Sequence, residues 1–144
     1  MAADKSTIEH LASVELFRRC SPKDLEALAG IVDDLAVPAG TVLCDQGRVA
    51  DDCYVVRDGQ ADVSVGGQVV ATVGPGESIG EMALLDHLPR SATVTARTPM
   101  HLYVIGAARF NELLDSGAIA RALLEQLSLR VRDLEVGRGR LASY

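Results

Sequence analysis

One stretch of this sequence, residues 76–94, combines glycines with a carboxylate and an arginine at short spacing. Gly80 allows a tight backbone turn, and Glu81–Leu85 is predicted to form a short helix whose first N–H groups would face an anion. Arg90 can donate two parallel, charge-assisted hydrogen bonds to a phosphate. The Glu81 carboxylate only accepts hydrogen bonds, so it suits a sugar hydroxyl. Together these groups predict a ligand that carries both a phosphate and a sugar hydroxyl, such as a ribose phosphate.

The stretch resembles the phosphate-binding cassette of the cyclic-nucleotide-binding family, which includes bacterial catabolite activator proteins and regulatory subunits of cyclic-AMP-dependent kinases. The family pattern is an apolar residue, Gly-Glu, any residue, a small residue and an apolar residue. After a spacer it continues with Arg, a small residue, Ala, any residue and an aliphatic residue. Residues 79–84 read Ile-Gly-Glu-Met-Ala-Leu and residues 90–94 read Arg-Ser-Ala-Thr-Val, which satisfies the pattern throughout. The resemblance extends over about Leu16 to Glu135.

This resemblance implies a role for each cassette residue. Glu81 would accept a hydrogen bond from the ribose 2′-hydroxyl, Gly80 would bring the backbone close to the sugar, and Arg90 would pair with the cyclic phosphate. The backbone N–H groups of Ala83 and Ser91 would complete the phosphate cradle. The expected ligand-binding residues are Gly80, Glu81, Met82, Ala83, Arg90, Ser91 and Ala92.

The choice of base depends on Ser91 and on the last helix. The bacterial activators have Ser at the position of Ser91 and bind cyclic AMP, so cyclic AMP is the expected ligand, with cyclic GMP as the alternative. Those activators also place two adjacent hydroxyl residues of the last helix against adenine. The corresponding region near Leu134 lacks them, so an apolar lid is expected instead. The candidate lid residues are Val131, Leu134 and Glu135.

The elements that must position the cassette follow from the change in apolar period along the chain. A helical period covers about residues 7–33, where Ser21 and Asp24 mark a helix start. Short strands separated by turn residues fill about 34–105, and Gly66-Gly67 suits a two-residue hairpin turn. Helices return over about 107–136. We expect an α+β, mainly β fold over residues 1–144 in one domain: an eight-stranded β-roll or jelly-roll barrel flanked by N-terminal and C-terminal helices.

Composition limits the partners. The formal net charge of −6 supplies no concentrated positive field for non-specific DNA or anionic membranes. The sequence starts without a signal-peptide pattern, and no apolar run is long enough to span a bilayer. The three cysteines and three histidines show no pairing or metal-ligand spacing, so we expect reduced thiols, no metal and a cytoplasmic protein. Only nine residues follow Glu135, too few for a helix-turn-helix, so no DNA binding is expected.

Several charged residues allow a plainer interpretation. Glu81 and Arg90 could pair with each other as a surface salt bridge. The acidic residues of the loops near 45–52, namely Asp45, Asp51 and Asp52, are interpreted as solvated charges. Arg130, Arg132, Arg138 and Arg140 are interpreted as helix-end cations explained by the helix dipole and solubility. The apolar stripe from Ile119 to Leu134 has three open roles: packing against the barrel, a ligand lid or a dimer seam.

Three functions remain open at this point. The favoured one is a cyclic-nucleotide sensor without its own DNA-binding domain, acting on a regulated protein partner or on its own homodimer. The alternative is a relative that binds no ligand and serves as a protein-interaction scaffold. The third is an enzyme on a β-roll, such as a cupin, which needs a His-rich metal site that this sequence lacks. No catalytic constellation is recognisable, so the chain is not expected to be an enzyme.

Overall fold

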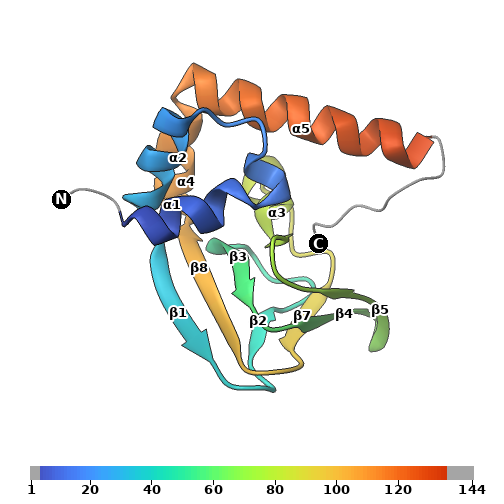
Figure 1. The fold of residues 1–144 in the computed structure, drawn as a ribbon. Coiled ribbons are helices and arrows are strands. Elements are labelled where there is room, and N and C mark those ends of the chain that lie inside the picture. The colour runs from blue at the N-terminus through green and yellow to red at the C-terminus, as the bar shows by residue number, and fades with distance from the viewer. Residues whose placement is uncertain (1–3, 136–144) are drawn as a thin grey trace.

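The computed structural model describes residues 4–135, which form helices at both ends and strands in between (Figure 1). The helical elements are α1 (Lys5–Ala12), the 3₁₀ turn η1 (Glu15–Phe17), α2 (Pro22–Ala29), α3 (Glu81–Asp86), α4 (Ala107–Leu114) and α5 (Gly117–Glu135). The strands are β1 (Asp33–Val37), β2 (Val42–Cys44), β3 (Asp52–Asp58), β4 (Ala61–Val65), β5 (Gln68–Val73), β6 (Ser78–Ile79), β7 (Thr93–Ala96) and β8 (Met100–Gly106). The expected order of helices, strands and helices is confirmed.

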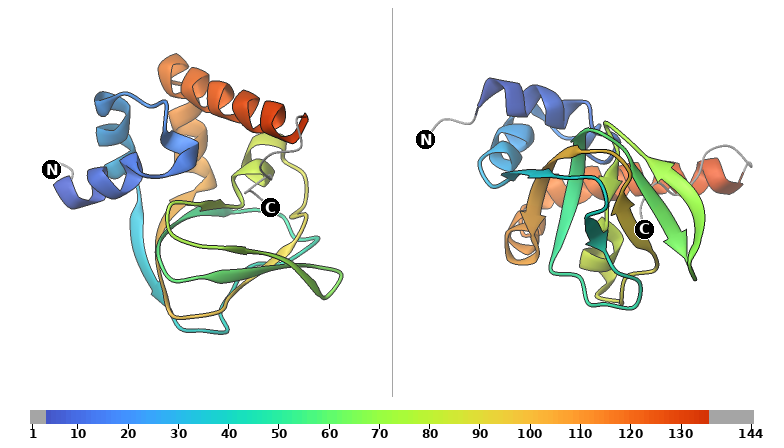
Figure 2. Two further views of the ribbon diagram at one scale, coloured as in Figure 1. Left: turned by 45° about the vertical axis from the view of Figure 1, so that its right-hand side comes forward. Right: turned by 90° about the horizontal axis from the view of Figure 1, so that it is seen from below.

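The eight strands form two antiparallel sheets of four, in the orders β1-β8-β3-β6 and β2-β7-β4-β5 (Figure 2). Because the ladder hydrogen bonds leave two separate sheets, the strands make an open roll and not a closed barrel. The mainly β fold class is as expected from the sequence. At the tip of the β4–β5 hairpin, Gly66 and Gly67 have φ values of 58° and 83°. Two consecutive positive φ angles are what the predicted hairpin turn requires.

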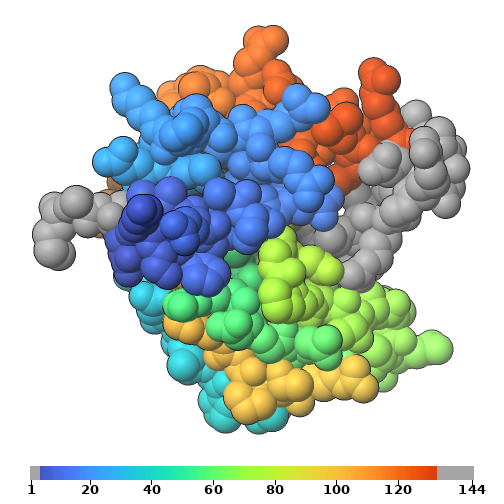
Figure 3. Space-filling model, in the orientation of Figure 1, coloured from blue at the N-terminus to red at the C-terminus, as the bar shows by residue number. Residues whose placement is uncertain are grey.

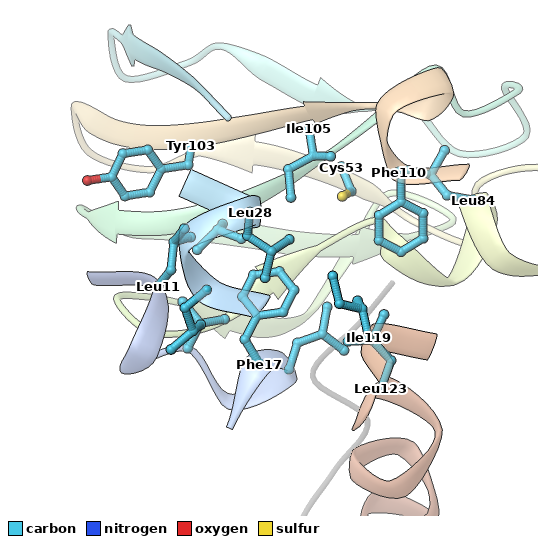
Figure 4. Close-up of a cluster of buried hydrophobic side chains, with 14 residues drawn as sticks. Leu11, Phe17, Leu28, Cys53, Leu84, Tyr103, Ile105, Phe110, Ile119 and Leu123 are labelled. Atoms are coloured by element: carbon cyan, nitrogen blue, oxygen red, sulfur yellow. The ribbon is translucent and has the colours of Figure 1, made fainter. Parts of the chain in front are cut away.

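Side chains alternate along β3 and divide the interior into two apolar clusters. Tyr54 and Val56 point into the roll, whereas Cys53 and Val55 face the helices. The cluster beneath the helices is drawn in Figure 4, where Phe17 from η1 and Leu123 from α5 approach the sheet. The helices therefore lie together over one end of the roll, as the space-filling view also shows (Figure 3).

The first helical segment departs from the prediction. The apolar period predicted helix through Leu16, but α1 ends at Ala12 and a separate 3₁₀ turn begins at Glu15. The Glu15 backbone N–H donates to the Gly76 carbonyl at 3.1 Å, a contact outside the local helix that ties this turn to the strand region. The start of α2 is as predicted, because Ser21 and Asp24 form a reciprocal capping box. No helix within residues 4–135 is long and apolar enough to cross a membrane.

Candidate ligand-binding site

The cassette begins at Gly80, which connects β6 to α3 in a left-handed conformation with φ 83°. A side chain at this position would be strained by the positive φ, and its Cβ would collide with the guanidinium of Arg90. The Gly80 carbonyl accepts a hydrogen bond from Arg90 Nη1 at 3.0 Å. Glycine is therefore required because the arginine lies directly against the backbone here.

Arg90 is buried, with 5% of its surface exposed. Its Nη2 donates to the Asp52 carbonyl at 2.7 Å and lies 3.4 Å from the Asp52 carboxylate. The backbone of Arg90 is fixed as well, since its N–H donates to the Arg48 carbonyl and its carbonyl accepts from Gly47, both at 2.8 Å. The interpretation of Asp52 as a solvated loop charge is wrong, because it lies in β3 against the buried cation.

Glu81 is the first residue of α3 and is completely buried. One carboxylate oxygen, Oε1, accepts from the Ser78 hydroxyl at 2.8 Å and from Arg130 Nη1 at 3.1 Å. The other, Oε2, is buried with no hydrogen-bond partner. Since Arg90 and Glu81 are both buried and bind other groups, the interpretation of the two as a surface salt bridge is wrong.

Arg130 is the residue of this site that the sequence analysis missed. It was interpreted as a helix-end cation, but α5 carries it inward and only 3% of its side chain is exposed. Besides Glu81, it approaches the Glu15 carboxylate, with Nε 3.6 Å from Oε1. Arg130 thus joins three parts of the molecule: the cassette helix α3, the N-terminal turn η1 and α5. No local sequence signal distinguishes it from the other arginines of this helix.

The remaining predicted residues occupy varied surroundings. Ala83 and Ala92 are buried, Met82 is half-buried and Ser91 is exposed. Val131, proposed as a lid residue, is 50% exposed on α5 next to Arg130. The other two lid candidates, Leu134 and Glu135, belong to the last turn of α5, but their side chains lie outside the described part of the structure.

Two thiols lie beside the cassette. Burial raises the pKa of Cys44 to about 11, and the neighbouring Arg90 only partly opposes this shift. Burial also raises the pKa of the fully enclosed Cys53 thiol well above its usual value. Both cysteines are free and protonated at neutral pH, so they act as small packing residues in the described structure.

The cassette holds two buried charged side chains, Arg90 and Glu81, and Glu81 has one oxygen without a hydrogen-bond partner. A buried guanidinium is costly unless an anion compensates it, and the ion pair of Arg90 with the Asp52 carboxylate is 3.4 Å long. The orphaned Oε2 of Glu81 needs a hydrogen-bond donor. An anionic ligand that also carries a hydroxyl would satisfy both groups.

Comparison with known proteins agrees with this geometry. The family model for the cyclic nucleotide-binding domain matches residues 35–116, which contain the roll, except for the first two residues of β1, and the whole of the cassette. The chain belongs to the cyclic nucleotide-binding domain family. Among other members, a cAMP-dependent protein kinase regulatory subunit of Yarrowia lipolytica is 40% identical over 89 residues, covering 60% of this chain and 24% of the relative.

Similar sequences and structures also occur in proteins other than kinase regulatory subunits. A cyclic nucleotide-gated potassium channel of Mesorhizobium japonicum is 34% identical over 122 residues, covering 85% of this chain and 34% of the channel. The chain thus spans only about a quarter to a third of the length of these curated relatives. Among solved structures, the regulatory domain of Toxoplasma gondii PKA with cAMP superposes with a TM-score of 0.73 at 31% identity, covering 82% of this chain and 48% of that one. The N-terminal domain of a Streptomyces coelicolor transcriptional regulator gives a TM-score of 0.75 at 28% identity, covering 88% and 94%.

Proposed function

We propose that this chain is a regulatory module that binds cyclic AMP through Arg90 and Glu81. The observation that carries the proposal is that one short cassette holds a buried arginine, whose ion pair with Asp52 is 3.4 Å long, and a buried carboxylate with one unused oxygen. The cyclic phosphate would bind Arg90, together with the backbone N–H groups of Ala83 and Ser91. The ribose 2′-hydroxyl would donate to Glu81.

Relatives support the class of ligand. The matched kinase regulatory subunit is named for its dependence on cAMP, and the superposed Toxoplasma gondii domain is a complex with cAMP. Ser91 supports cyclic AMP over cyclic GMP through the family resemblance. Val131, Leu134 and Glu135 remain the proposed lid over the base. Gly80, Met82 and Ala92 would shape the backbone around the sugar and phosphate.

The proposed output is a movement of α5. Arg130 donates to Oε1 of the same carboxylate whose unused Oε2 would accept from the ribose, so the ligand would act directly on the group that holds Arg130. Leu84 of α3 and Leu123 of α5 also belong to one apolar cluster, which gives the cassette a second contact with this helix. A ligand shifts a conformational equilibrium only through different affinities for the two states, and these contacts supply such a difference.

The module would transmit this change to a regulated protein partner or to a second copy of itself in the cytoplasm. Its relatives are regulatory domains, and we propose no catalytic activity for it. A scaffold without a ligand is the weaker alternative. It gives no reason for a buried arginine and a buried glutamate with an unused oxygen in the same cassette.

Isothermal titration with cyclic AMP, cyclic GMP and 5′-AMP tests the proposal. The expected order of affinity is cyclic AMP, then cyclic GMP, with 5′-AMP weakest because its open phosphate carries a second charge and a different shape. The proposal is supported if cyclic AMP alone binds saturably, or if the three nucleotides bind with affinities in that order. A titration in which no nucleotide binds would instead support the scaffold.

A further inference from the structure

A groove runs between the N-terminal turn η1 and helix α5, away from the strands of the roll. It consists of two adjoining hollows of about 600 and 490 Å³ that share Arg19, Glu125 and Leu129. We call this feature the α5 groove. Figure 1 shows η1 and α5 on the helical side of the molecule, and in Figure 3 the blue N-terminal segment and the orange-to-red α5 meet along its upper edge.

The α5 groove is strongly basic in an acidic chain. Five of the fourteen Lys and Arg residues line it, against two carboxylates, although the net charge of the chain is −6. The lining arginines are Arg18, Arg19, Arg121, Arg130 and Arg132. Among the side chains that the structure describes, those of residues 4–132, Arg18 and Arg132 form no ion pair, so their charges are available to a partner. A local excess of one charge sign attracts partners of the opposite sign.

Exposed apolar side chains lie among these cations. Leu124 is 67% exposed and Leu129 is 39% exposed, and both line the groove. Deeper in the groove, Gln126 and Arg130 are 4% and 3% exposed, and each has polar atoms without a hydrogen-bond partner: Oε1 of the glutamine and Nη2 of the arginine. An occupant would therefore need apolar side chains, negative charges and hydrogen-bonding groups.

These requirements distinguish between two candidate occupants of the groove, a second copy of this chain and a segment of a partner protein. A second copy of this chain, docked groove to groove, would place one set of five arginines and two glutamates against another, and an excess of like charge at an interface opposes association. An amphipathic segment with acidic residues would pair with the arginines while its apolar face covers Leu124 and Leu129. We propose that the α5 groove binds an acidic amphipathic helix of a partner protein.

This site shares a residue with the nucleotide site. Arg130 lines the groove on one side and donates to Glu81 of the cassette on the other. An acidic partner that draws Arg130 toward itself would weaken the hydrogen bond from Nη1 to Glu81, and this would couple the two sites. Coupling of binding free energies is reciprocal: the partner must change the affinity for cyclic AMP by the same factor as cyclic AMP changes the affinity for the partner. This coupling rests on the proposed function, whereas the groove itself does not.

Fluorescence anisotropy with a designed peptide tests the groove without any nucleotide. The probe is a labelled helix of about 18 residues, roughly 27 Å long, with Leu on one face and Glu on the others. Its control has Lys in place of every Glu. We expect saturable binding of the acidic peptide that weakens as salt rises, and no saturation with the basic one. Equal binding of both peptides, or of neither, would overturn the proposal.

Two double variants locate the binding. Arg18→Glu with Arg132→Glu reverses two exposed charges in the groove and should weaken the acidic peptide by about tenfold or more. Arg48→Glu with Arg97→Glu reverses two exposed arginines elsewhere and should leave binding within about twofold. An equal loss in both double variants would mean that the peptide follows overall charge and not the groove. Sedimentation of the free protein shows whether a second copy occupies the groove. A dimer that the acidic peptide cannot dissociate would also refute the proposal.

A final titration measures the coupling. Wild-type protein saturated with cyclic AMP should bind the acidic peptide with a changed affinity, and the variant Arg130→Met should lose that change. Peptide binding that is unaffected by cyclic AMP would refute the coupling but leave the groove intact. Failure of cyclic AMP to bind at all would refute the proposed function, again without affecting the peptide result.

Discussion

Replacing Arg130 with methionine should destabilise the protein by about 3 kcal/mol. The substitution keeps a long, flexible side chain in place but leaves the Glu81 carboxylate buried without a cation. Both partners are almost fully enclosed, at 3% and 0% exposure, so solvent screening reduces their interaction little. Removing one partner of a buried pair costs about 3–5 kcal/mol. We expect the lower end of this range, because the Ser78 hydroxyl still donates to Glu81.

Urea unfolding of four proteins measures this interaction as a double-mutant cycle: wild type, Arg130→Met, Glu81→Gln and the double variant. A loss of about 3 kcal/mol corresponds to a fall in melting temperature of roughly 10 °C for a chain of this size. The double variant should lose about 1–3 kcal/mol less than the sum of the single losses. The matched control, Arg132→Met, replaces an exposed arginine two residues away and should change stability by less than about 0.5 kcal/mol. Additive losses, or equal losses for Arg130→Met and Arg132→Met, would refute the reasoning.

Three further predictions concern the cassette and its helix. Gly80→Ala should lower the free energy of unfolding by at least about 1 kcal/mol and weaken the binding of cyclic AMP, because φ is 83° and the new Cβ meets Arg90. Thermal melts and titration measure the two effects, and a substitution that changes neither would contradict the prediction. Burial raises the Cys44 pKa from 9.0 to about 11, so the folded state favours the protonated thiol over the thiolate. The stability that comes from keeping this thiol protonated should be lost as pH rises from about 9 to about 11. Urea unfolding across that range should show a smaller loss in Cys44→Ala, and identical profiles would contradict the assignment. Hydrogen exchange over residues 119–135 should slow when cyclic AMP saturates the protein, whereas equal protection would mean that α5 is fixed.

Local features of this fold could be predicted from the sequence because the signals lie within a few residues. Ser21 caps α2 where a helix start was predicted, and the paired glycines at 66 and 67 have the backbone angles that their hairpin needs. The cassette was found by its spacing, since Gly80, Glu81 and Arg90 lie within one short stretch. The period-2 alternation of the strands also predicted the mainly β class.

The contacts that the sequence did not predict are long-range. Arg130 reaches Glu81 across 49 residues, and Arg90 reaches Asp52 across 38. Arg130 and Asp52 look solvated in their local context, because charged side chains are usually exposed. Only the packing of α5 and β3 around the cassette brings them to buried partners. The break after α1 has a similar cause, since Glu15 is bound by the distant carbonyl of Gly76.

The most direct test of the central claim is calorimetric titration of cyclic AMP into the wild-type protein and the Arg90→Ala variant, with Arg97→Ala as a matched exposed control. Removing a buried charged partner of the ligand should cost roughly 2–5 kcal/mol of binding, or about two to three decades in affinity. The control should bind like the wild type, and circular dichroism should show that all three proteins are folded. Unchanged affinity of the folded Arg90→Ala variant would contradict the assignment of Arg90 as the phosphate-binding residue.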